Sequence, residues 1–145
     1  MTNVIKVKKV EPNDPDLQKA FAIRKTVFVE EQHCPPELEY EHDDVSVHFL
    51  ASCNEIPCGA ARWRKTEKGF KLERFAVLLH FRGMGVGAHL VKTLLGDISP
   101  TDLPVYLNAQ LSAMNFYTRF GFRPVGDYFE EAGIMHQQMI YSSQS

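Results

Sequence analysis

A segment with three alternate glycines constrains the fold of this chain more than any other feature. A strand-like stretch, Arg74–Val77, is followed by Arg82-Gly83-Met84-Gly85-Val86-Gly87 and then by Ala88–Leu95, which has the composition and period of a helix. Alternate glycines let a ligand approach the backbone, and the helix start offers unpaired N–H groups with the positive end of its dipole. Because Arg82 adds a positive charge, the segment predicts a strand–loop–helix unit that cradles an anion such as a pyrophosphate.

Two common phosphate-binding motifs can be compared with this loop. A P-loop places lysine directly after its last glycine, whereas Ala88 and His89 follow Gly87 here. The permissive dinucleotide fingerprint Gly-x-Gly-x-x-Ala fits Gly83–Ala88, but the next expected strand ends in Asn108-Ala109-Gln110 and supplies no acidic residue for a ribose. Too little chain remains for a doubly wound sheet. A nucleotide-dependent oxidoreductase is therefore disfavoured, and another cofactor with a pyrophosphate is favoured.

The rest of the pattern predicts one α/β domain spanning residues 1–145. The expected strands, which include an antiparallel meander in the middle of the chain, are residues 5–10, 47–53, 58–65, 70–77, 105–108, 122–128 and 134–141. The expected helices are residues 14–32, capped by Asp14-Pro15, then 88–95, and 111–120, closed by Gly121. The acidic stretch His33–Val45, which contains Pro35-Pro36, predicts an exposed loop.

Composition narrows the functional classes. The net charge of −2 and the isoelectric point near 6.3 predict no general attraction to nucleic acid or to an anionic membrane surface. The first residues lack a secretory signal pattern, and a cytoplasmic location is expected. The odd number of cysteines, Cys34, Cys53 and Cys58, predicts small structural residues rather than a disulfide framework. Since no Cys-x-x-Cys or paired-histidine spacing occurs, we expect no metal site.

Two motifs in the second half of the chain resemble those of the GNAT superfamily of N-acetyltransferases. Its Gln/Arg-x-x-Gly-x-Gly/Ala hallmark is matched by Arg82–Gly87, with Gly83 as an additional glycine. Asn108 followed by Ala113–Phe122 is similar to the second family segment, in which a strand asparagine precedes Ala-x-x-Phe-Tyr-x-x-x-Gly-Phe. Ile23–Gln32 with the acidic stretch behind it is similar to small ElaA-like members. The resemblance implies a mixed, mostly antiparallel sheet of six to seven strands flanked by helices.

The resemblance also implies acetyl-coenzyme A as cosubstrate and direct transfer of its acetyl group to an amine in a ternary complex. Backbone N–H groups from Gly83 to Ala88 would hold the pyrophosphate, and the strand edge at Phe75, Ala76 and Val77 would pair with the pantetheine arm. The Val77 N–H would polarise the thioester carbonyl. The remaining expected cofactor contacts are Asn108, Asn115, Phe116 and Tyr117. Tyr117 is expected to be the acid, because a phenol of pKa near 10 suits a leaving thiolate.

The sequence constrains the identity of the general base and of the acetyl acceptor less than that of the cofactor. Freeing an ammonium of pKa near 10 at neutral pH costs about 4 kcal/mol, which a base or a desolvated site must supply. We assign Glu73 as the base, while the alternatives Glu30, Glu31, His42, Asp43 and His136 stay open. We expect the acceptor to be recognised by Arg24, Phe28, Trp63 and the acidic stretch.

A small amine such as an amino sugar, a polyamine or an amino acid is the expected acceptor, with a protein amine as the next possibility. A homodimer is reasonable for this superfamily. The competing class is a non-catalytic acyl-coenzyme A binding module, which would keep the glycine loop without needing Tyr117.

Overall fold

The computed structural model describes residues 3–142, which form a seven-stranded sheet in the order β1-β2-β3-β4-β5-β7-β6. The strands are β1 (Ile5–Val10), β2 (Ser46–Cys53), β3 (Ile56–Lys65), β4 (Phe70–Val77), β5 (Val105–Gln110), β6 (Phe122–Glu131) and β7 (Ile134–Tyr141). The α-helices are α1 (Asp16–Arg24), α2 (Pro36–Glu39), α3 (Val86–Ile98) and α4 (Met114–Thr118). The β4–β5 pair is parallel and every other neighbouring pair is antiparallel. This confirms the predicted mixed, mostly antiparallel sheet flanked by helices.

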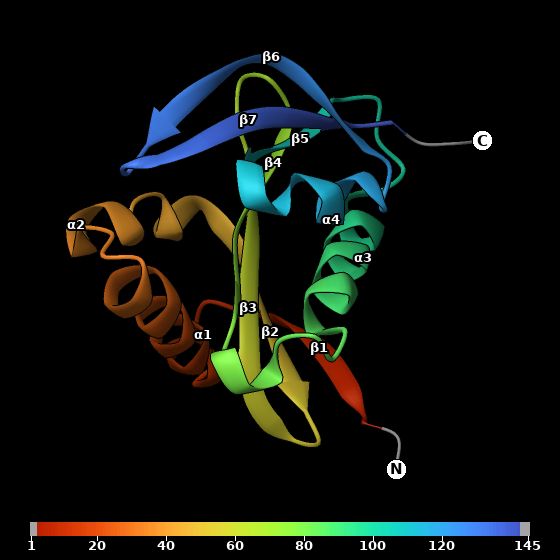
Figure 1. Ribbon diagram of the computed structural model, residues 1–145. Coiled ribbons are helices and arrows are strands. Elements are labelled where there is room, and N and C mark those ends of the chain that lie inside the picture. Colours follow the sequence, from red (N-terminus) through yellow and green to blue (C-terminus); the bar gives the residue numbers. More distant parts are fainter. Residues whose placement is uncertain (1–2, 143–145) are drawn as a thin grey trace.

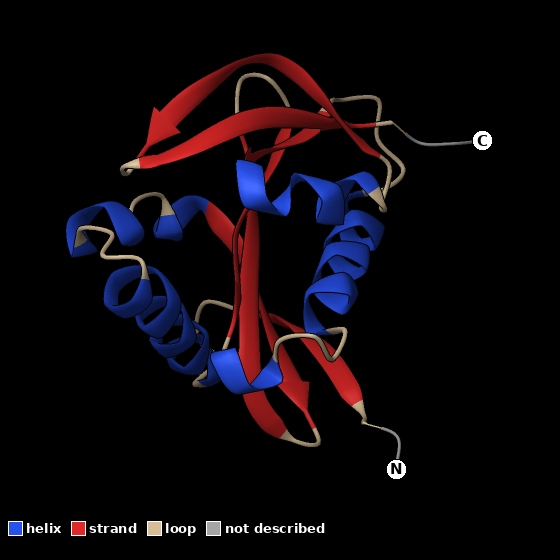
Figure 2. Cartoon of the chain, viewed as in Figure 1, coloured by secondary structure: helices blue, strands red, loops and turns tan. Residues whose placement is uncertain are grey.

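Helices cover both faces of the sheet. In the view of Figure 1, α1 and α2 lie on one side of β3 and α3 lies on the other, while β6 and β7 arch over the top. Figure 2 shows the same arrangement by element type. Side chains alternate along the strands, so Leu50 and Ala60 pack with α1 residues such as Ile23, whereas Phe49 packs with α3 residues such as Leu90. We refer to the two sides as the α1 face and the α3 face.

The first helical segment matches its predicted extent but changes type. The Asp14 carboxylate accepts a hydrogen bond from the Asp16 N–H at 2.8 Å, which confirms the expected start signal. After Arg24 the chain continues as a π-helix, Lys25–Glu31, and Gln32 caps it. The Gln32 N–H donates to the Val27 carbonyl at 3.2 Å, an i→i+5 bond that closes this wider turn.

The prediction of an exposed loop at residues 33–45 is wrong in part. This stretch contains α2 and a 3₁₀ turn, Asp43–Val45, and the Glu39 side chain is fully buried. Its carboxylate accepts a hydrogen bond from Arg24 Nε at 2.6 Å and lies 3.2 Å from Arg74 Nε. Two cations from neighbouring elements therefore hold this acid in the interior, while its burial raises the pKa of the carboxyl.

The three cysteines have the environments expected of structural residues. Cys53 and Cys58 are buried and Cys34 is half-buried, and all three are free thiols. Burial raises the pKa of Cys58 to about 11, which leaves an unreactive thiol at neutral pH and agrees with a structural role.

None of the helices between residues 3 and 142 is long and apolar enough to cross a membrane.

Candidate active site

Divergence of the two parallel strands creates the opening at the centre of the sheet. β4 and β5 pair at Phe70–Val105 and at Lys71–Tyr106, close to where both strands begin. In the described chain no further pairs join them, so the later residues of β4 and β5 present free edges to each other. An extended ligand could insert between these edges and use their unpaired backbone groups.

A bulge on β4 adds unpaired backbone beside this opening. Ala60 pairs with Ala76 and Arg62 pairs with Glu73, so one residue of β3 opposes two residues of β4, one of which is Arg74. Arg74 has φ of +61°, which bends the strand at this point. The sequence did not predict this bulge, because the stretch contains no glycine, which is the residue that usually marks a bulge inside a strand.

Beyond the bulge, the backbone of Val77 points away from β3. The Leu78 N–H donates to the Cys58 carbonyl at 2.9 Å, which makes the neighbouring pair Gly59–Val77 a non-hydrogen-bonded one. In such a pair both backbone groups of Val77 face the other edge, and its carbonyl accepts a hydrogen bond from Arg82 Nε at 2.8 Å. The Val77 N–H is therefore directed towards the side on which β5 has diverged.

The glycine loop lies directly behind this edge. Gly83 and Gly85 have φ of +81° and +92°, a conformation that favours glycine, and Gly85 caps the N-terminus of α3. A side chain on Gly87 would approach Phe116 Cζ to 3.2 Å, so the missing Cβ lets α4 pack against the start of α3. The loop is exposed on its outer side and presents the first N–H groups of α3, as the sequence predicted.

Arg82, which was expected to add a positive charge to the loop, is paired within the protein. Its Nη2 lies 2.9 Å from both carboxylate oxygens of Glu31, while its Nε holds the Val77 carbonyl. The guanidinium therefore joins the π-helix to the end of β4. An anionic ligand at the loop would compete with Glu31 for this charge, and the ion pair is solvent-accessible enough to exchange.

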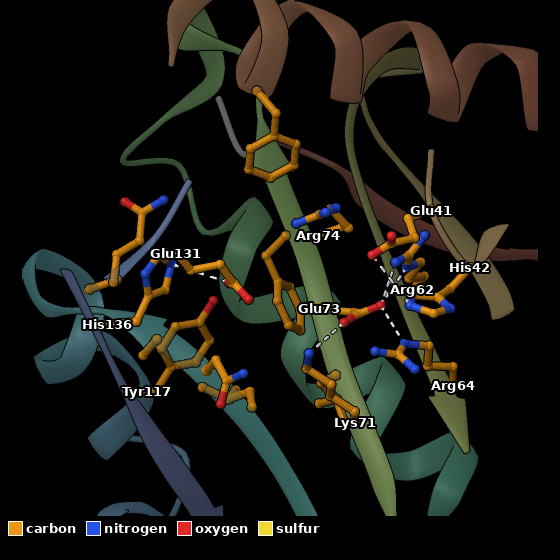
Figure 3. A pocket seen from close by; sticks show the side chains of 18 of the residues that line it. Glu41, His42, Arg62, Arg64, Lys71, Glu73, Arg74, Tyr117, Glu131 and His136 are labelled. Carbon is orange, nitrogen blue, oxygen red and sulfur yellow. Dashed lines mark hydrogen bonds and ion pairs between the residues drawn. The ribbon is translucent and has the colours of Figure 1, made fainter. Parts of the chain in front are cut away.

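A cavity of about 220 Å³ opens on the α1 face, and a second of about 240 Å³ adjoins it and shares much of its wall. Figure 3 looks into the first, with β4 crossing the centre and β7 on the left. The wall combines polar side chains from strands β3, β4, β5 and β7 with residues of the π-helix and the acidic stretch. The side chains used below are Phe28, Glu41, Arg62, Arg64, Lys71, Glu73, Arg74, Asn108, Tyr117, Glu131 and His136.

Tyr117 and Asn108 lie where the cavity meets the opening between the strands. The Tyr117 ring packs against Phe75 of β4 with centroids 5.7 Å apart, and burial raises the pKa of its phenol, so the hydroxyl stays protonated. Asn108 has a buried Oδ1 without a hydrogen-bond partner in residues 3–142. A buried orphan acceptor favours a donor from a ligand or a water molecule at this point. Asn115, by contrast, is exposed, and Phe116 packs between Tyr117 and Phe120.

Comparison with known proteins settles the family. The sequence model of the acetyltransferase (GNAT) domain matches residues 12–143. The chain belongs to the GNAT acetyltransferase family. The N-acetyltransferase YjcF of Bacillus subtilis is 37% identical over 134 residues, which are 90% of this chain and 96% of YjcF. ElaA of Escherichia coli is 36% identical over 128 residues, 83% of each protein.

Solved structures agree with this assignment. The crystal structure of Escherichia coli ElaA superposes with a TM-score of 0.82 at 30% identity and covers 96% of this chain and 100% of that one. A GNAT family acetyltransferase from Elizabethkingia anophelis, solved with acetyl-CoA bound, has the same fold at 16% identity, with a TM-score of 0.69 and 94% of each chain covered. Family membership and the N-acetyltransferase relatives support acyltransferase activity.

In this GNAT domain, the environment of Glu73 argues against its assignment as the base. Burial alone would raise the pKa of this carboxyl, but Arg62, Lys71 and Arg64 outweigh it and lower the pKa to about 2. Glu73 Oε2 accepts hydrogen bonds from Arg62 Nε at 2.8 Å and from Arg64 Nε at 2.9 Å. A carboxylate held so firmly in its charged state has little affinity for a proton at neutral pH.

His136 is better placed for proton transfer. Its Nδ1 lies 2.7 Å from the Ile134 carbonyl, which can only accept, so Nδ1–H donates this hydrogen bond and Nε2 is the ring nitrogen left for other partners. Nε2 lies 3.8 Å from Glu131 Oε2, and the ring stacks on Phe129. Figure 3 shows His136, Glu131 and Tyr117 together on one side of the cavity.

The other candidate bases are placed less favourably. Glu31 is paired with Arg82, and Asp43 accepts hydrogen bonds from both Arg24 and Arg62. Glu30 is exposed and does not line the cavity, whereas His42 lines it with 43% of its side chain exposed.

The three residues expected to recognise the acceptor are separated. Phe28 lines both cavities. Arg24 is 1% exposed and holds Glu39 and Asp43, so it is an internal structural residue and does not reach the cavity. Trp63 projects to the α3 face, where its Nε1 donates to Asp97 Oδ2 at 2.9 Å. Successive side chains of β3 point to opposite faces of the sheet, so Trp63 lies on the face opposite Arg62 and Arg64.

Several cavity residues were absent from the predictions: Arg64, Lys71, Arg74, Gln110 and Glu131. Arg62 and Arg64 are two apart in a predicted strand, as are Lys71 and Glu73, and this spacing alone puts each pair on one face. The signal was therefore in the sequence. Among residues 3–142, no cluster of three or more histidine, cysteine or acidic side chains is arranged to bind a metal ion.

Proposed function

We propose that this protein is an acetyl-CoA-dependent N-acetyltransferase that acetylates the primary amine of a small molecule. The observation that carries the proposal is the divergence of β4 and β5, which opens onto the glycine loop on one side and onto the cavity of the α1 face on the other. This arrangement would let a thioester and an amine meet from opposite sides. The acetyl-CoA bound in the Elizabethkingia anophelis relative supports the choice of cosubstrate.

The cofactor arm would lie along the free edge of β4. Backbone N–H groups of Gly83–Ala88 at the start of α3 would hold the pyrophosphate, and the edge Phe75–Val77 would pair with the pantetheine amides. The buried Asn108 Oδ1 would accept a hydrogen bond from this arm. When bound, acetyl-CoA supplies the activated acyl group, and the Val77 N–H, turned towards the opening, would donate to its carbonyl oxygen.

Tyr117 would assist the departure of the thiolate. Because burial raises its pKa, the phenol stays protonated and would stabilise the developing sulfur anion as a hydrogen-bond donor. Complete proton transfer to a thiolate of lower basicity would be uphill, so the hydrogen bond itself is the main contribution.

His136 would take the proton of the acceptor. His136 lines the cavity and would accept the proton on Nε2, and the Glu131 carboxylate 3.8 Å away would stabilise the imidazolium that forms. This assignment replaces Glu73, which we propose acts by holding Arg62, Arg64 and Lys71 in place.

The test is acetylation of a mixed amine library, read by mass spectrometry and by release of the coenzyme A thiol. We expect Tyr117→Phe to lower kcat about 10- to 100-fold with unchanged acetyl-CoA affinity, because it removes one hydrogen bond to a charged group. Tyr128→Phe, an exposed tyrosine on β6, is the matched control. Tight acetyl-CoA binding without any acetylated product would instead support a non-catalytic binding module.

A further inference from the structure

A charged network that extends from the floor of the cavity into the protein interior contains more positive than negative charge. Five cations, Arg24, Arg62, Arg64, Lys71 and Arg74, share three carboxylates, Glu39, Asp43 and Glu73, in one connected network. Glu41 and Glu131 also line the cavity, but their side chains are 58% and 50% exposed, and among residues 3–142 neither forms an ion pair with a cation of this network. Excess charge away from bulk water is costly unless an anion compensates it.

The excess is concentrated at Arg64 and Lys71. These residues lie directly opposite each other on β3 and β4, and like charges in that position destabilise a sheet. Their side chains are only 17% and 15% exposed, and both rely on Glu73, which Arg62 also uses. A like-charged pair in a half-buried position breaks a local rule of sheet stability, and such departures concentrate at functional sites.

Arg64 and Lys71 both retain hydrogen-bond donors that could bind a ligand. Arg64 uses Nε for Glu73, and within residues 3–142 its two terminal nitrogens have no hydrogen-bond partner. Lys71 Nζ lies 3.1 Å from Glu73 Oε1 and has further protons to donate. A guanidinium fork beside an ammonium matches the geometry of a carboxylate or a phosphate.

We propose that Arg64 and Lys71 form an anion subsite of the acceptor pocket, so that the acceptor is an amine that also carries a carboxylate or a phosphate. The inference rests on the proposed function. The anion of the acceptor would bind at Arg64 and Lys71, while its amine would lie towards Glu131, His136 and Tyr117, which Figure 3 shows on the opposite side of β4 from Arg64. A polyamine, which carries only positive charge, would be repelled from this floor.

Matched pairs of amines test the subsite through activity. We would compare 4-aminobutyrate, 5-aminopentanoate and 6-aminohexanoate with propylamine, butylamine and pentylamine, and O-phosphoethanolamine with ethanolamine. At least one amine with a carboxylate or phosphate should be acetylated about tenfold or more efficiently than its partner without that group. Arg64→Gln and Lys71→Gln should each raise KM for that substrate about tenfold with little change in kcat, whereas Lys65→Gln, on the other face of β3, should not. Equal or better use of the amines that lack an anionic group would overturn the proposal.

A binding measurement keeps the proposal independent of turnover. Glutarate and inorganic phosphate would be titrated calorimetrically at constant ionic strength into the wild type and the same three variants. We expect at least one anion to bind the wild type and Lys65→Gln, and to be lost from Arg64→Gln and Lys71→Gln. Absence of binding to the wild type, or equal binding to all four proteins, would contradict the subsite. Anion binding with no acetylation of any amine would leave the subsite in place and refute the proposed function.

Discussion

Arg24 is the residue whose sequence context and structural role differ most. It was expected to take part in recognition of the acceptor, yet it lies 1% exposed with Glu39 and Asp43 as partners. No local pattern could reveal this, because the partners come from a stretch whose composition is typical of an exposed loop. The buried ion pair positions the acidic stretch over the cavity.

Breaking this pair should therefore destabilise the fold strongly. Glu39→Gln and Arg24→Met should each lower the free energy of unfolding by about 3 to 5 kcal/mol, because each removes one partner from a buried charge that keeps only Asp43 or Arg74. Lys8→Gln, which removes an exposed ion pair with Asp14, should change it far less, because solvent screens an exposed pair. Urea denaturation followed by circular dichroism measures all three. Similar small losses for the three variants would show that the interior pair adds little.

Glu73 gives the site a pH-dependent component of stability. Its folded-state pKa of about 2 lies below the ordinary value of 4.5, so its contribution is fully present above pH 4.5 and is lost as pH falls towards 2. The shift corresponds to about 3 kcal/mol, order of magnitude. A carboxyl carbon NMR titration should find Glu73 still ionised at pH 3, well below the ordinary glutamate pKa of 4.5. Titration of Glu73 near pH 4 would contradict the cation cluster around it.

At the scale of elements, the packing of α3 on the sheet depends on small residues. A Cβ on Gly59 of β3 would lie 2.9 Å from Val86 Cγ1 and 3.2 Å from the Ala76 carbonyl oxygen. Gly96, near the end of α3, has no neighbour within 4 Å of its Cβ position. Substituting the two glycines therefore distinguishes the effect of close packing at Gly59 from the unfavourable effect of a glycine inside a helix at Gly96.

Alanine at these two positions should have opposite effects. Gly59→Ala should lower the free energy of unfolding by about 1 to 3 kcal/mol because it forces α3 outward. Gly96→Ala should raise it by about 0.5 to 1 kcal/mol because glycine is unfavourable inside a helix. Thermal unfolding of both variants beside the wild type provides the comparison, and a stabilised Gly59→Ala would refute the contact.

Sequence patterns predicted the elements well where local physics decides them. Period-two alternation located the strands, including β1, β4 and β7 at their observed bounds, and the Asp14 and glycine signals located the helix starts. The failures have tertiary causes. The acidic stretch folds because interior arginines require Glu39, and the bulge at Arg74 arises from the mismatch between β3 and β4, which neither strand reveals alone.

At the scale of the molecule, the site exists because segments far apart in sequence meet at the divergence of β4 and β5. The glycine loop, Tyr117 and Asn108 could be named in advance because the GNAT motifs carry them. Arg64, Lys71, Glu131 and His136 come together through strand order, since β7 lies between β5 and β6. Their shared role therefore required the topology, even though their residue types and spacings were visible.

The most direct test is calorimetric titration with acetyl-CoA of the wild type, Gly85→Asp and the matched control Gly126→Asp. Gly85 and Gly126 both have positive φ, but Gly126 lies in the bulge between β6 and β7, away from the loop. The account predicts acetyl-CoA binding by the wild type and Gly126→Asp, loss of binding in Gly85→Asp, and weak binding of acetyl-pantetheine, which lacks the pyrophosphate. Equal binding of acetyl-CoA to all three proteins, or none to the wild type, would contradict it.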